Sequence, residues 1–171
     1  MSRKCGDCKA CCEGWLLDES LDMYPGKPCK HCTNAGCAIY EERPVNPCRT
    51  FKCAWLDRPE EYADDLRPDL IGAIILHNRP WEDFDTLRIA PTGDTVAPEV
   101  LERLRLHALQ KEVPLLWVDR LKEGDKYVGV HNKALGSEEF SEAVRWSVDP
   151  QDAWHFSAPD LSVRMTKNWN K

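Results

Sequence analysis

Short apolar runs mark the strands expected in the second half of the chain. The runs at 70–76 and 86–90 are rich in isoleucine and leucine, and Gly72 interrupts the first where a bulge would fit. Two further runs, at 115–120 and 126–131, flank a short link that contains glycine, which favours a β-hairpin. The pattern therefore predicts a small antiparallel sheet.

Helical spacing of apolar residues occurs in two stretches. Between residues 98 and 112 they recur every three or four positions, after a proline and a glutamate suited to a first turn. A second helix is expected to start at Ser137 as its N-cap, with two glutamates following and an apolar face that continues to Ser147. The chain after Pro150 lacks either pattern and is expected to be irregular. Two helices and a small sheet indicate an α+β fold.

The first 53 residues lack this periodicity but contain every cysteine of the chain. The nine are Cys5, Cys8, Cys11, Cys12, Cys29, Cys32, Cys37, Cys48 and Cys53. An odd number of cysteines in a reducing compartment argues against a disulfide framework, and loops rich in glycine and proline need cross-links to hold their shape. We therefore expect a cysteine-cluster metal-binding segment at 1–55 and an α+β part at 56–171, packed together as one compact unit.

Composition narrows the class of protein and its partners. The 171 residues suit one domain, and no apolar run is long enough to span a bilayer, so we expect no membrane partner. The amino terminus has no apolar signal segment, which indicates a cytoplasmic protein. The net charge of −6 and the lack of a basic stripe argue against nucleic acid.

The densest part of the cysteine pattern is the sequence CxxCxxCC at residues 5–12. Each two-residue spacer lets a tight turn bring neighbouring sulfurs toward one ion. Cys11 and Cys12 are adjacent, so their side chains diverge and serve two nearby centres more easily than one. Two metal sites or one polynuclear site are predicted. Zinc, iron, an iron-sulfur cluster and copper(I) all accept thiolate ligands, and the spacing leaves the metal open.

Four ordered motifs, at 5–12, 28–31, 36–44 and 48–53, resemble those of the CxxCxxCC cysteine-cluster family, whose domain is described as zinc- or iron-chelating. The resemblance covers about the first third of the chain. It implies that the metal ligands are Cys5, Cys8, Cys11, Cys12, Cys29, Cys37, Cys48 and Cys53. Cys32 departs from the pattern, because the family usually has an apolar residue there. Eight sulfurs are enough for two four-cysteine sites.

Three polar residues accompany the third and fourth motifs. Arg43 and Arg49 are expected to donate hydrogen bonds to thiolate sulfur or to backbone carbonyl groups beside the metal, and Tyr40 to pack next to them. The alternative for the arginines is an ion pair with Glu41 or Glu42.

The predicted function is a structural or storage metal site that holds zinc or iron and has an interaction role, with metal ions and a protein as partners. The alternative is an iron-sulfur oxidoreductase or a modification enzyme, in which the cluster is the redox or substrate-binding centre. The sequence contains no dinucleotide fingerprint, phosphate loop or hydrolase motif, so it leaves open whether the protein is an enzyme.

Overall fold

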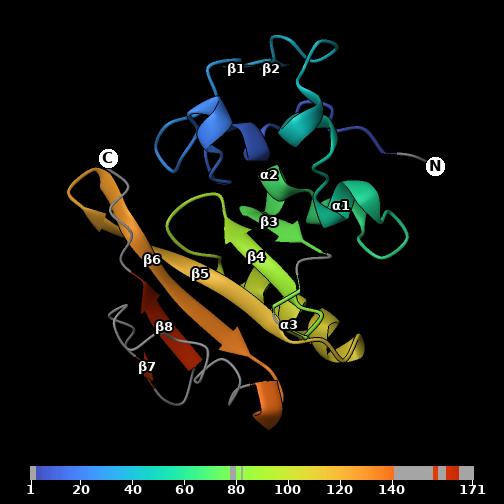
Figure 1. The fold of residues 1–171 in the computed structure, drawn as a ribbon. Coiled ribbons are helices and arrows are strands. Elements are labelled where there is room, and N and C mark those ends of the chain that lie inside the picture. Colours follow the sequence, from blue (N-terminus) through green and yellow to red (C-terminus); the bar gives the residue numbers. More distant parts are fainter. Residues whose placement is uncertain (1–2, 78–79, 82, 141–155, 158–160, 166–171) are drawn as a thin grey trace.

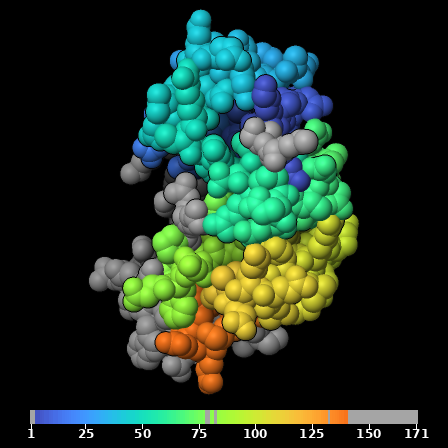
Figure 2. Space-filling view, turned by 90° about the vertical axis from the view of Figure 1, so that its right-hand side faces the viewer, coloured from blue at the N-terminus to red at the C-terminus, as the bar shows by residue number. Residues whose placement is uncertain are grey.

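The computed structural model describes residues 3–77, 80–81, 83–140, 156–157 and 161–165. Its main element is a six-stranded sheet, and the cysteine-rich segment lies at one end of the molecule beside β3 (Figure 1). Figure 2 shows the same stacking, with the cysteine segment in blue to teal and the helix α3 in yellow. The strands, in the spatial order β3-β4-β5-β6-β8-β7, are β3 (Ala73–Leu76), β4 (Leu87–Pro91), β5 (Leu115–Glu123), β6 (Lys126–Leu135), β8 (Leu161–Met165) and β7 (Phe156–Ser157).

The α+β class is confirmed, but the sheet is mixed and not purely antiparallel. Strands β4 and β5 run parallel, with Leu87 opposite Leu115. Parallel neighbours need a crossover, and α3 (Pro98–Gln110) supplies it, because it carries the chain back to the end of the sheet where β4 began. The other paired strands of the sheet are antiparallel.

The strand predicted at 70–76 starts later than expected. Residues 68–71 form the short helix α2 (Pro68–Ile71), and Gly72 ends that helix in the left-handed conformation, with φ of 66°. β3 therefore begins at Ala73, and Gly72 is a helix cap and not a bulge. The strand predicted at 86–90 is confirmed within one residue at each end.

The predicted hairpin is present and longer than its apolar runs suggest. β5 has nine residues and β6 has ten, and Gly124 turns the chain between them with φ of 59°. The predicted irregular tail is wrong, because β8 pairs antiparallel with β6 and places Ala134 opposite Leu161. A strand at the edge of a sheet offers a row of unpaired backbone groups, so a segment with weak periodicity of its own can add to it.

The helix predicted from residue 98 is confirmed as α3, which has thirteen residues and buries Leu104 and Ala108 against the sheet. The N-cap at Ser137 is also confirmed, since its hydroxyl accepts a hydrogen bond from the backbone N–H of Phe140 at 3.2 Å. The expected continuation to Ser147 lies outside the described residues. Among the described helices, none is long and apolar enough to cross a membrane.

One hydrophobic core contains residues from both parts of the chain. Ala10, Cys53 and Trp55 from the amino-terminal side are buried in the same cluster as Ile74 and Leu104. Full burial of a leucine or isoleucine side chain contributes about 1.5 to 3 kcal/mol. The cysteine-rich segment is therefore attached to the sheet by shared packing.

Candidate metal centre

Backbone hydrogen bonds gather the cysteine motifs of the amino-terminal segment. The N–H of Cys29 donates to the carbonyl oxygen of Cys12 at 2.8 Å, and the N–H of Cys32 donates to that of Cys29 at 2.8 Å. The strands β1 (Cys32–Thr33) and β2 (Gly36–Cys37) then pair antiparallel and place Cys32 directly opposite Cys37. Side chains of directly opposite residues project from the same face, so these two thiols are neighbours.

Gly14 allows the chain to double back between Cys12 and Cys29. It has φ of 91°, and a Cβ atom at this position would lie 2.3 Å from the carbonyl oxygen of Tyr24 and 2.7 Å from that of Lys27. A larger residue would collide with this backbone, so the close approach requires glycine.

Arg3 fixes the start of the CxxCxxCC motif against the helix α1 (Ala54–Asp57), which begins directly after Cys53. Its guanidinium donates to the carbonyl oxygens of Trp55 at 2.7 Å and Tyr62 at 2.6 Å. It also lies over the Trp55 ring, 4.8 Å from its centre. Arg3 thereby brings Cys5 to the neighbourhood of Cys53, forty-eight positions away in the chain.

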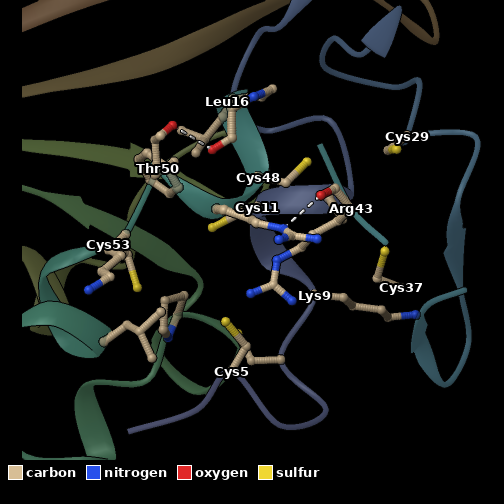
Figure 3. Close-up of a pocket in the computed structure, with 18 of the residues that line it drawn as sticks. Cys5, Lys9, Cys11, Leu16, Cys29, Cys37, Arg43, Cys48, Thr50 and Cys53 are labelled. Atoms are coloured by element: carbon tan, nitrogen blue, oxygen red, sulfur yellow. Dashed lines mark hydrogen bonds between the residues drawn. The ribbon is translucent and has the colours of Figure 1, made fainter. Parts of the chain in front are cut away.

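All nine cysteines line one cavity of about 1130 Å³, and all nine are free thiols. Figure 3 shows six of them on its walls. Cys5 and Cys53 lie on one side of the view, Cys29 and Cys37 lie on the other, and Arg43 lies between the two pairs.

Electrostatic interactions sort the thiols into two groups. Burial, together with smaller contributions from the thiolates of Cys32, Cys37, Cys29 and Cys48 in that order, raises the pKa of Cys12 to about 12. These five residues form the outer group: Cys12, Cys29, Cys32, Cys37 and Cys48.

The other four thiols interact mainly with one another. Burial raises the pKa of Cys53 to about 11, with smaller contributions from the thiolates of Cys5 and Cys8. Burial also raises the pKa of Cys11 well above its ordinary value, with thiolate contributions from Cys53, then from its neighbour Cys12, and then from Cys8 and Cys5. These four form the inner group: Cys5, Cys8, Cys11 and Cys53. The adjacent residues Cys11 and Cys12 therefore belong to different groups.

Backbone amides already favour a thiolate at the inner group. Burial raises the pKa of Cys8, but hydrogen bonds from the backbone N–H groups of Ala10 and Asp69 lower it. The backbone N–H of Leu56 has the same effect on Cys53. Hydrogen bonds of this kind stabilise the charged form of sulfur, which is the form that binds a metal.

The donor chemistry and the grouping fit a thiolate-bound metal, but the present spacing of the side chains does not. Within the described part of the chain, no three Cys, His, Asp or Glu side chains are close enough to hold one ion. The thiols of each group would have to converge for an ion to bind.

The arginines of the third and fourth motifs bond to backbone oxygens. Arg43 donates to the carbonyl of Tyr40 at 2.7 Å and stacks over its ring, 3.8 Å from the centre. Arg49 donates to the carbonyls of Arg43 at 2.9 Å and Glu41 at 2.7 Å. Burial raises the pKa of Cys5, and the guanidinium of Arg43 opposes part of that rise. The contacts are those expected with backbone carbonyls, and a role of Tyr40, Arg43 and Arg49 beside a metal stays a prediction.

Three residues that organise the cavity were missed from the sequence. Neither Arg3 nor Gly14 was singled out from the sequence, and Cys32 was left out of the ligands because it departs from the family pattern. No local signal marks Arg3, because its partners are fifty-two or more positions away. A signal existed for Cys32, since the short link between Cys32 and Cys37 contains asparagine and glycine.

Comparisons with protein families, curated proteins and solved structures found no match to this chain. The resemblance to the CxxCxxCC family therefore rests on the motifs at 5–53, and the site is judged by its own residues.

Proposed function

We propose that this protein binds zinc or iron through cysteine thiolates at two neighbouring sites, one in each group of thiols. The observation that carries the proposal is that nine thiols, eight from the four motifs and Cys32, line one cavity, with Cys11 and Cys12 in different groups. A set of thiols that acted only as small apolar residues would have no reason to gather around a cavity.

The charge of the cavity wall supports two sites. Seven Lys and Arg residues line it against three Asp and Glu residues, an excess of four positive charges. A divalent ion with four thiolates has a charge of about −2, so two such sites would have about −4. The wall therefore offers the charge that two tetrathiolate sites need.

A structural or storage role follows from what such an ion would supply. Thiolate bonds to a metal would cross-link loops that have little regular structure, and binding would release protons from the thiols. A reducing compartment such as the cytoplasm would keep these thiols available. In this proposal a protein partner would meet the exposed loops around the cavity.

The inner group also supports a second candidate. Cys5, Cys8 and Cys11 have the CxxCxxC spacing of a cubane iron-sulfur cluster, and Cys53 is a distant fourth ligand. An iron-sulfur cluster at this position would make an oxidoreductase or a modification enzyme the better assignment.

The test is metal analysis of the full chain purified without oxygen, together with its absorption spectrum. We expect about two metal ions per chain and protection of eight thiols from alkylation, since each ion takes four. A colourless protein with zinc favours the structural or storage role, and a visible charge-transfer band favours the iron-sulfur enzyme. A metal-free protein with nine reactive thiols would overturn both.

A further inference from the structure

We propose that Cys32 and Cys37 form a reversible dithiol–disulfide pair, which exchanges with low-molecular-weight disulfides such as glutathione disulfide. The pair lies on the hairpin of β1 and β2, at the end of the molecule away from the six-stranded sheet (Figure 1). This inference goes beyond the proposed function and needs no bound metal, so either of the two can fail without the other.

The hydrogen bonds around the hairpin identify the kind of strand pair that the two cysteines form. Cys32 and Cys37 are direct partners across the antiparallel strands. The N–H of Ala38 donates to the carbonyl oxygen of His31 at 2.9 Å, so the ladder bond belongs to the next pair along. The N–H of Cys32 donates to the carbonyl oxygen of Cys29 at 2.8 Å. Cys32 and Cys37 are therefore a non-hydrogen-bonded pair, the kind in which the side chains lie closest together.

This kind of pair suits a disulfide. In a non-hydrogen-bonded pair the Cα atoms lie about 4.5 Å apart, and bonded cysteines have Cα atoms about 4.4 to 6.8 Å apart. Both thiols are free and only partly buried, so a small oxidant can reach them. A disulfide that is exposed on a surface hairpin is also reduced more easily than one within a core, which makes the bond reversible.

The turn between the strands holds the two thiols opposite each other. The hydroxyl of Thr33 donates to the carbonyl oxygen of Gly36 at 2.8 Å and accepts a hydrogen bond from the N–H of Ala35 at 3.3 Å. Gly36 has φ of 110°, a conformation that favours glycine. The hairpin is therefore shaped by its own bonds, and closing the disulfide requires little further ordering of the chain.

Spacing along the chain would favour a different pairing. Cys29 and Cys32 are only three positions apart, whereas Cys32 and Cys37 are five positions apart. Cys29 is buried, with 8% of its surface exposed, while the two hairpin thiols are partly exposed. The fold therefore selects the longer pairing, and the disulfide that forms distinguishes the hairpin from an unfolded chain.

The reaction is an ordinary thiol–disulfide exchange. The thiolate of one cysteine attacks glutathione disulfide, forms a mixed disulfide and releases one glutathione thiolate. The thiolate of the other cysteine then attacks the mixed disulfide, forms the bond between Cys32 and Cys37 and releases the second glutathione. The two cysteines lose two electrons, which reduce the glutathione disulfide, and their two protons end on the two glutathione thiols. An excess of glutathione reverses both steps.

The test uses the full chain in glutathione redox buffers, without oxygen and with a chelator present so that no metal competes for Cys37. The remaining thiols are then alkylated, and cleavage after Lys30 and Tyr40 releases a peptide, residues 31–40, that contains these two cysteines and no other. We expect this peptide to be the first to appear unlabelled and two hydrogens lighter. The equilibrium constant for its disulfide should be at least about tenfold larger than in urea, because the hairpin aligns the two thiols.

A shifted thiol provides the matched control. Cys37→Ser combined with Ala38→Cys keeps nine cysteines and the same peptide, but it moves one thiol to an exposed position that pairs with His31. The equilibrium constant of this variant should fall by about tenfold, to the value found in urea. An equal constant in the variant and the wild-type chain, an equal constant with and without urea, or a first disulfide between Cys29 and Cys32 would each overturn the inference.

Discussion

The buried guanidinium of Arg120 in β5 donates a hydrogen bond to the carbonyl oxygen of Trp15, 2.8 Å away and 105 positions earlier in the chain. It also donates to the carbonyl oxygens of Gly93 at 2.8 Å and Pro91, and it lies over the Trp15 ring. Burial lowers the pKa of Arg120 to about 10, so it remains charged at neutral pH. One side chain therefore joins the sheet, the loop before α3 and the cysteine-rich segment.

Replacing Arg120 by methionine should destabilise the protein by about 2 to 4 kcal/mol, because carbonyl oxygens on three segments lose their donor while the apolar stem is largely kept. Chemical denaturation of the two proteins measures the difference in free energy of unfolding. Arg105→Met is the matched control, since the Arg105 side chain is 37% exposed and, among the described residues, pairs with Glu102 in the same helix. Equal losses in the two variants would show that the buried hydrogen bonds of Arg120 contribute little.

Cys11→Ser should remove one metal ion, and Cys12→Ser made in a Cys32→Ser background should remove the other. The two residues are adjacent, but the thiol of Cys11 interacts most strongly with Cys53, and that of Cys12 with Cys32. Native mass spectrometry of Cys11→Ser, and of Cys12→Ser combined with Cys32→Ser, should therefore show about one ion each in place of about two, because the affected group is left with three thiols. A single ion that both substitutions remove would contradict two separate sites.

Cys32→Ser should leave the number of bound ions unchanged. The outer group keeps four thiols without Cys32, which is the number that a tetrahedral ion needs. Metal analysis after exhaustive washing measures the stoichiometry. The position of Cys32 opposite Cys37 makes the test informative, because loss of an ion would make Cys32 an obligatory ligand and displace another cysteine from the set.

Gly14→Ala should unfold the loop between Cys12 and Cys29 and reduce metal binding by the outer group. Gly124→Ala is the control for the positive φ alone, because no atom lies within 4 Å of a Cβ atom there. The control should lose about 1 kcal/mol of stability from backbone strain, and Gly14→Ala clearly more because of its contact with two carbonyl oxygens. Thermal unfolding with zinc quantification compares them, and equal effects would mean that the close approach is unimportant.

The metal-free protein should become less stable as the pH rises above about 9. The pKa of Cys12 is raised to about 12 and that of Cys53 to about 11, from an ordinary value of 9.0. Between pH 9 and these raised pKa values, both thiols keep their protons in the folded chain and lose them in the unfolded chain. The free energy of unfolding therefore falls as the pH rises, whereas below pH 9 the two thiols have little effect on it.

Denaturation with chelator and reductant at pH 7 to about 10.5 measures this loss, and Cys12→Ser isolates the contribution of one thiol. The variant should lose less stability with rising pH than the wild-type chain. Parallel pH profiles for the two proteins would show that the buried thiol of Cys12 has an ordinary pKa.

Several elements could be predicted from the sequence because their signals lie in neighbouring residues. The spacing of apolar residues predicted α3 and the hairpin of β5 and β6, and a serine before two glutamates predicted the cap at Ser137, which the bond to Phe140 confirms. The thiol chemistry of residues 5–53 is also a property of composition, and the adjacent pair Cys11 and Cys12 indicated two groups before any fold was known.

The sequence alone determined which segments favour a helix or a strand, and it supplies the nine thiols. Its adjacent residues Cys11 and Cys12 also predicted two groups of thiols. Only the tertiary structure decided that β4 and β5 run parallel, that β8 adds to β6, that Cys53 joins Cys5, and that Cys32 lies among the outer thiols. These features depend on contacts between residues tens of positions apart. Such contacts form according to which surfaces can be buried together and which backbone groups still need a partner, and neither is visible in the pattern of any one segment.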